Sequence, residues 1–481
     1  WSWPAAASPR MAQRMGSFSP KRRQGPPSGS AEASLQGKKR TSFRKWMFVW
    51  TVAAAFVCGF RSLLAVGWGS SGLQLASLSL FHSVHEATRG SVMCDDLDGF
   101  LSAFKERHLV PLEKTTLGQP NASSTEQFYC VKPSSERFAL EGCGECRGPP
   151  SVALLFLAKD KVPFGQLWAD WLGLASDRRK FTVYLHRHDN ATAALHPLFN
   201  ASLIEPVDTS YGSFILGENA LWRAALRDPC NQMMVLLSVT HVPVSHPDVV
   251  YDVLFETRSD DMGGLPTSRI CYRDHFKQSG PDRREADVVD SIARDPSCQD
   301  AESNEGYDRK HMQWRTYNRY HAVLTAAQGV NYPHGELPNW YRPLKSASDE
   351  WFPHHVLRRT LGNKAVWKQV NGGLGDWSQQ REPHIEELFC DTALCWKNKK
   401  DFCGLGTAYQ CSKWGPLCFS QLKLGKLKEL IRSRHPLFFR KVLPNATMII
   451  NSKQREVGLV SEMLLPLIRD NSQHTVQSAV S

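Results

Sequence analysis

Polar and ionisable side chains follow three apolar runs in the middle of this 481-residue chain. Lys159 and Asp160 end the run SVALLFLAKD, residues 186–189 end KFTVYLHRHD, and residues 238–241 end NQMMVLLSVTH. Apolar runs of this length are typical of buried strands. Ligands bind beyond the carboxyl ends of the strands in parallel sheets. The sequence therefore predicts a ligand site built from these side chains.

Common catalytic and nucleotide-binding fingerprints do not accompany these runs. No G-x-G-x-x-G or G-x-x-x-x-G-K-[ST] follows any of them, which excludes dinucleotide and P-loop sites. The G-x-S-x-G string is also absent, which disfavours a serine hydrolase. The pairs His186/His188 and His354/His355 lack the i, i+4 spacing of a H-E-x-x-H zinc site. We expect structural or substrate-contact roles for these histidines.

Two other patterns resemble metal sites. The D-x-D string at Asp96 and Asp98 lies in a helix-like stretch and does not follow a buried strand, so we expect an exposed helix face. The C-x-x-C pair Cys143/Cys146 has zinc or redox spacing, but no second pair lies at a matching distance. A structural disulfide role is favoured over zinc or redox chemistry for both cysteines.

The elements that position the strand ends alternate along the chain. Apolar residues at helical spacing predict a helix over 162–175, and the string ENALWRAALRD predicts another over 218–228. These helices separate buried strands expected around 151–160, 181–185 and 233–237. Strand–helix–strand alternation predicts an α/β fold with a mostly parallel sheet and flanking helices.

Charge is concentrated at the N-terminus. The chain has 58 Lys+Arg and 47 Asp+Glu, a net charge of +11. Residues 1–46 hold ten basic side chains and one acid, a net +9, which leaves +2 for the rest. A near-neutral body excludes a basic nucleic-acid-binding domain. At 42% hydrophobic residues the chain can build a sizeable core, which excludes global disorder.

A membrane anchor is predicted directly after this tail. Residues 46–68 form an apolar span whose one charged residue is Arg61, and 23 residues suffice to cross a bilayer core of about 30 Å. Basic residues precede the span, so the tail 1–45 is expected in the cytosol and the rest in a lumen. Residues 69–148 resemble a stem, and residues 149–481 form the expected catalytic body. A cleaved signal peptide and an organellar transit peptide are the alternatives.

Cysteines and sequons fit an oxidising compartment. Twelve cysteines follow the predicted span, and disulfides are the default for such an even set. Four N-x-[ST] sequons lie on the same side of the span, which predicts N-glycosylation at Asn121, Asn190, Asn200 and Asn445.

Several strings in order resemble the core-2/I-branching β-1,6-N-acetylglucosaminyltransferase family, its plant and algal branch in particular. They are SVALLFLAKDKVPFGQLWADWL, FTVYLHRH, ALWRAALRDPCNQMMVLLSVTHVPV, KHMQWRTYNRYHA, SASDEWFPHHVL, KAVWKQVNGG and RHPLFFRKVLPNA, within about residues 149–450. The resemblance implies a type II Golgi membrane protein with a GT-A-type domain. It also implies inverting transfer from a UDP-sugar to a glycan or glycoprotein acceptor, with no metal or other cofactor.

The same resemblance suggests site residues. Glu350, in the string Asp349-Glu350-Trp351, matches the family's general base, and Trp367 matches an aromatic residue that lines the acceptor. Lys441, with Arg440 beside it, matches a basic residue at the diphosphate, where cations replace the metal of other GT-A enzymes. If this stretch is extended, only one of the two faces the site. Asp349, His186 and His188 are expected to line the donor or acceptor. A second basic residue of the family has no match in register, since Lys413 is displaced.

Three readings of this chain stay open at this point. A sugar transferase is favoured, with N-acetylglucosamine as the expected donor sugar and xylose or glucuronic acid as alternatives. A non-catalytic lumenal carbohydrate-binding protein could keep the same fold. A secreted, disulfide-rich adhesion protein is disfavoured because the body shows a buried α/β pattern.

Overall fold

The computed structural model describes residues from 91 onward, with gaps. The chain divides into residues 1–69 and residues 70–481, and every described residue belongs to the second unit. The described residues are 91–112, 128–131, 143–188, 191–207, 209, 214–256, 258–259, 262–271, 313–329, 356–357, 360–361, 370, 391–394, 405–409, 416–433, 436–450 and 455–480. The tail 1–45, the anchor 46–68 and the site residues Asn121, Asn190, Asp349, Glu350 and Trp367 lie outside them.

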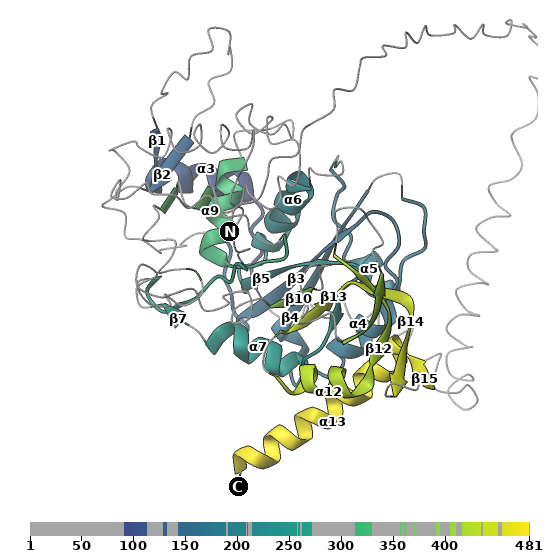
Figure 1. Ribbon diagram of the computed structural model, residues 1–481. Helices are drawn as coiled ribbons and strands as arrows, with labels where there is room; N and C mark the ends of the chain where they lie inside the picture. Colours follow the sequence, from purple (N-terminus) through teal and green to yellow (C-terminus); the bar gives the residue numbers. More distant parts are fainter. Residues whose placement is uncertain are drawn as a thin grey trace, which may run out of the picture. The chain divides into compact units, whose positions relative to one another are not determined.

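A four-stranded sheet forms the centre of this unit, in the order β4-β3-β5-β9 (Figure 1). The strands β3 (Ser151–Ala158), β4 (Phe181–Arg187) and β5 (Asn231–Ser238) run parallel, which confirms the predicted strands and their direction. The edge strand β9 (Thr316–Asn318) pairs antiparallel with β5, so the sheet is mixed.

Alternate residues of β3 face two different cores. Val152, Leu154 and Phe156 pack with α4 (Gly165–Leu172), the predicted crossover helix between β3 and β4. Ala153, Leu155 and Leu157 pack on the other face with α6 (Ile215–Leu226) and α9 (Arg319–Gly329). Successive side chains of a strand point to opposite faces. An all-apolar β3 therefore requires helices on both faces, and the fold supplies them.

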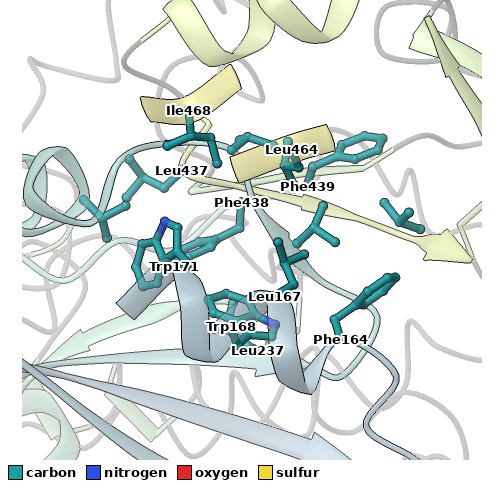
Figure 2. Close-up of a cluster of buried hydrophobic side chains, with 14 of the residues drawn as sticks. Phe164, Leu167, Trp168, Trp171, Leu237, Leu437, Phe438, Phe439, Leu464 and Ile468 are labelled. Atoms are coloured by element: carbon teal, nitrogen blue, oxygen red, sulfur yellow. The ribbon is translucent and has the colours of Figure 1, made fainter. Parts of the chain in front are cut away.

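The first core also joins the C-terminal elements to the sheet. Figure 2 shows side chains of α4 packed against Phe438 and Leu464, and the rings of Trp168 and Phe438 lie 6.0 Å apart. Phe438 belongs to β13 (Phe438–Arg440), which lies between β10 (Thr392–Leu394) and β6 (Val242–Pro243). This packing places the residues near position 440 beside those that follow β5 (Asn231–Ser238).

The other elements complete the unit. They are α3 (Leu97–His108), β1 (Leu109–Leu112), β2 (Phe128–Val131), the 3-10 helix η2 (Arg178–Lys180), α5 (Pro197–Ala201), α7 (Pro247–Glu256), β7 (Arg258–Ser259), β8 (Leu265–Pro266), β11 (Gly406–Tyr409), β12 (Cys418–Lys423), α12 (Leu424–Arg432), β14 (Val442–Ile450), β15 (Arg455–Leu459) and α13 (Val460–Val480). The strands β11, β12, β14 and β15 form a second four-stranded sheet.

Part of the predicted stem packs on the body. Leu97, Leu101 and Phe104 of α3 are buried, and the ring of Phe104 meets Tyr320 of α9 edge to face at 6.5 Å. The D-x-D string starts this helix: Asp96 accepts a hydrogen bond from the Gly99 amide, and exposed Asp98 pairs with Arg223. These carboxylates cap and flank a helix, as expected.

The C-x-x-C pair forms two separate disulfides. Cys143 bonds to Cys94, and Cys146 bonds to Cys230. The expected structural role is confirmed, and neither cysteine is available for zinc or for redox exchange with the other. Cys271 and Cys418 are disulfide-bonded as well. Among the residues that the structure describes, no helix is both long and apolar enough to span a membrane.

Candidate functional site at the carboxyl end of β5

The ends of β3 and β4 hold one loop. Asp160, just after β3, accepts a hydrogen bond from the Ala193 amide at 3.0 Å. Arg187, the last residue of β4, donates to the Ala193 carbonyl. Two of the polar strand ends singled out in the sequence therefore fix the backbone that follows β4.

His186 of β4 is held by the backbone of the segment that follows β4 and is packed close to α6. Its side chain is buried, and Nε2 accepts a hydrogen bond from the Val207 amide at 3.1 Å. Its Nδ1 lies 3.1 Å from the place that a Cβ on Gly217 of α6 would occupy, so a larger residue at position 217 would crowd the ring. Burial lowers the pKa of His186 below its ordinary 6.5, which keeps the ring neutral at pH 7. His188, two residues on, is partly exposed.

A turn, residues 238–241, follows β5 and contains no acidic residue. The Ser238 amide donates to Nδ1 of His241 at 2.8 Å, and the Ser238 hydroxyl lies 2.9 Å from both Nδ1 and the Thr240 hydroxyl. Since Nδ1 accepts, the proton of the neutral ring belongs on Nε2, which lies 3.3 Å from the Thr392 hydroxyl. The turn is thus stabilised from within and from β10.

His241 is uncharged in this position. It is fully buried, and burial together with the nearby charge of Arg440 holds its pKa well below 6.5. A neutral imidazole adds no positive charge of its own, so the charge at this strand end comes from elsewhere.

Two basic residues lie beside the turn, since Arg440 ends β13 and Lys441 follows it. The strand β13 pairs with β6, which begins directly after His241, and the Val442 amide donates to the Thr240 carbonyl at 3.3 Å. The guanidinium of Arg440 lies over the ring of Trp314, 4.2 Å from its centre. Lys441 is half-buried, and burial and the charge of Arg440 lower its pKa. The predicted diphosphate residues therefore lie at the carboxyl end of β5.

A buried ion pair supports the strands around this corner. Arg269 lies 3.0 Å from Asp391, which also accepts a hydrogen bond from the Thr316 hydroxyl at 2.7 Å. The Asp391 carbonyl receives the amides of Leu437 and Phe438, the residues that lead into Arg440. The pair links β9, β10 and β13 and so places the cations relative to the central sheet.

The predicted site residues have different outcomes. Arg440 and Lys441 lie beside residues 238–241, whereas His186 is the last but one residue of β4, and β3 separates β4 from β5. Asn200 and Asn445 are exposed, as sequon asparagines must be for modification. Among the described residues, no group of three or more His, Cys, Asp or Glu could hold a metal ion.

Three residues of this corner were not predicted from the sequence: Trp314, Asp391 and Thr392. Trp314 lies in the family-like string KHMQWRTYNRYHA, which was its one available signal. Asp391 and Thr392 stand beside Cys390 in a cysteine-rich stretch where no periodicity marks a strand.

Comparison with known proteins agrees with this fold. Residues 152–283 match the family model of the Core-2/I-Branching enzyme. This region is therefore similar to the Core-2/I-branching family. The resemblance predicted from the sequence strings is thereby confirmed over β3 to β8, and Arg440 and Lys441 lie beyond the match.

One curated relative is a plant protein. The chain is 26% identical over 117 residues to Glycosyltransferase BC10 of Oryza sativa subsp. japonica. The alignment covers 23% of this chain and 29% of the rice protein. This chain therefore spans less than a third of the relative in that match.

Proposed function

We propose that this protein is an inverting glycosyltransferase of the GT-A type, which transfers a sugar from a UDP-sugar to a hydroxyl of a glycan or glycoprotein acceptor. One observation carries the proposal: Arg440 and Lys441 lie beside the turn at the carboxyl end of β5, a strand in the region that matches the Core-2/I-branching family. Ligands of α/β sheets bind at this edge, and two adjacent cations suit a diphosphate.

The cations take the electrostatic part that a metal has in other GT-A enzymes. As the bond between the anomeric carbon and the UDP oxygen breaks, negative charge develops on the diphosphate. Arg440 and Lys441 stabilise that charge most strongly where water is excluded. The turn at residues 238–241 contains no carboxylate to hold a cation. The proposed transfer needs no metal or other cofactor.

The acceptor side of the reaction is assigned by resemblance. Glu350 removes the proton from the acceptor hydroxyl as its oxygen attacks the anomeric carbon, and UDP leaves from the opposite face. Trp367 lines the acceptor sugar, and Asp349, His186 and His188 line the donor or acceptor. The proposed transferred sugar is N-acetylglucosamine, which would form a β-1,6 linkage to the acceptor. Xylose and glucuronic acid are the alternative donor sugars.

The proposed setting is the Golgi membrane. Residues 46–68 anchor the protein in type II orientation, which places residues 70–481 in the lumen. The disulfides Cys94–Cys143 and Cys146–Cys230 support an oxidising compartment for this unit. Disulfides are rare in proteins of reducing compartments such as the cytosol.

A donor panel tests the proposal. The purified full-length protein is incubated with UDP-N-acetylglucosamine, UDP-xylose or UDP-glucuronic acid and glycan acceptors, with and without EDTA. We expect transfer from one donor that EDTA leaves intact. The variant Glu350→Gln should lose about 10²–10⁴-fold in rate while it still binds UDP. Unaltered transfer by Glu350→Gln would refute the assignment of the general base. If the wild type bound UDP but transferred no sugar from any donor, the non-catalytic carbohydrate-binding alternative would be favoured.

A further inference from the structure

The geometry points to Trp314 as a positioning residue: we propose that its indole ring holds the Arg440 guanidinium in the orientation that receives the diphosphate. This inference rests on the proposed function and adds a residue to it. Trp314 touches no expected reacting atom and acts through Arg440.

Trp314 is delivered to the end of β5 by its own strand. Thr316 of β9 pairs with Val235, and the Leu236 amide donates to the Arg315 carbonyl at 3.0 Å. Continued in the same antiparallel direction, residue 314 falls beside the end of β5, where Ser238 begins the turn. The ring is buried, with 7% of the residue exposed, so it has little room to rotate away.

The Trp314 ring contacts both Arg440 and His241, the last residue of the turn after β5. The Arg440 guanidinium carbon lies 4.2 Å from the ring centre, and the His241 ring packs against the indole edge to face at 4.8 Å. His241 is itself fixed by Ser238 and Thr392. Arg440 is therefore held through one continuous chain of contacts that begins at the backbone of β5.

Stacking suits an arginine that must bind a phosphate. A guanidinium on an aromatic face keeps its N–H groups in its own plane, directed past the ring edge. Those N–H groups can then donate in pairs to phosphate oxygens. A lysine gains less from such a surface, because its ammonium is a point charge. The indole thus fixes the plane of the guanidinium before the nucleotide arrives, which reduces the entropy lost on binding.

A second buried tryptophan provides a matched control. Trp222 of α6 is fully buried and also has a guanidinium over its ring, that of Arg315 at 5.6 Å. That pair belongs to the same buried cluster as Trp314, with Glu218 as the counter-ion. A change at Trp222 removes comparable packing without touching the Arg440 contact.

The test is a double-mutant cycle on nucleotide binding by the full-length protein. UDP and uridine are titrated by calorimetry into the wild type, Trp314→Phe, Trp314→Leu, Arg440→Met and the double variant Trp314→Leu/Arg440→Met. We expect Trp314→Leu to weaken UDP binding about 10-fold, and Trp314→Phe less, because a smaller ring remains. Uridine, which has no diphosphate, should bind each variant as it binds the wild type.

The cycle separates positioning from general damage. In the Arg440→Met background, Trp314→Leu should cause no further loss of UDP affinity, because the group it positions is gone. Trp222→Phe should leave the ratio of UDP to uridine affinity unchanged. If Trp314→Leu does not fold, as judged by circular dichroism, the cycle is completed with Trp314→Phe.

The outcomes divide between the two proposals. Equal losses from the tryptophan change in the presence and absence of Arg440 would overturn the positioning role, and so would equal losses for UDP and uridine. A wild-type protein that binds no UDP would overturn the proposed function itself.

Discussion

Replacement of Glu218 by glutamine should destabilise the protein strongly. Glu218 and Arg315 form an ion pair with both side chains almost completely buried, at 2% and 1% exposure. Gln313 also donates to Glu218 at 3.2 Å, and the Arg315 guanidinium lies over the rings of Trp222 and Tyr317. The change leaves the buried guanidinium without its counter-charge.

The expected loss follows from this burial. Removing one partner of a buried ion pair costs about 3–5 kcal/mol of unfolding free energy, because the remaining charge stays desolvated. Glutamine keeps the shape and one hydrogen-bonding oxygen, so we expect a value near the lower end, about 3 kcal/mol. The control is Asp98→Asn, which breaks the Arg223–Asp98 pair, where the aspartate is 68% exposed. Exposed pairs contribute about 0.2–1 kcal/mol.

Urea unfolding followed by tryptophan fluorescence measures both changes. The double variant Glu218→Gln/Arg315→Met removes both charges and should be more stable than Glu218→Gln alone. Similar losses for Glu218→Gln and Asp98→Asn would refute the reasoning. A double variant whose loss equals the sum of the single losses would refute it as well.

Three further outcomes are expected. Replacing Cys146 and Cys230 together by alanine should cost up to about 4.5 kcal/mol in urea unfolding, because the bond closes a loop with a sequence separation of 84; an unchanged midpoint would contradict this. Below pH 6.5, His241 takes up a proton in the unfolded chain but stays neutral in the folded protein. The free energy of unfolding should therefore fall by about 1 kcal/mol per pH unit below 6.5, and His241→Asn should reduce this slope. The same slope in the variant would exclude His241 as its source. Protein from a eukaryotic secretory host should lose mass with peptide N-glycosidase, and less in Asn200→Gln/Asn445→Gln; no mass change would contradict both sites.

The central strands were predictable because their local sequence is sufficient. The runs that became β3, β4 and β5 are almost wholly apolar and separated by helical periodicity, so a parallel sheet with helices on both faces follows from burial alone. The antiparallel addition of β9 was not predictable, since a strand of three residues has no measurable period.

The corner that holds the candidate site depends on contacts distant in sequence. β6 has two residues and β13 three, and their pairing brings position 439 to position 242. Phe438 also packs on Trp168 of α4, a contact that no local pattern encodes. The two basic residues were predicted through a family resemblance, but the contact of Arg440 with Trp314 and the position of both residues beside the turn after β5 were not. The disulfide partners of Cys143 and Cys146 were likewise undetermined by spacing.

The central claim is that Lys441 and Arg440 bind the diphosphate of a nucleotide sugar. Calorimetric titration of UDP into the full-length wild type and into Lys441→Met tests it most directly. A charged hydrogen bond contributes about 1.5–3 kcal/mol, so the account predicts UDP binding at least 10-fold weaker in the variant. Equal UDP affinity in the two proteins, or no UDP binding by the wild type, would contradict it.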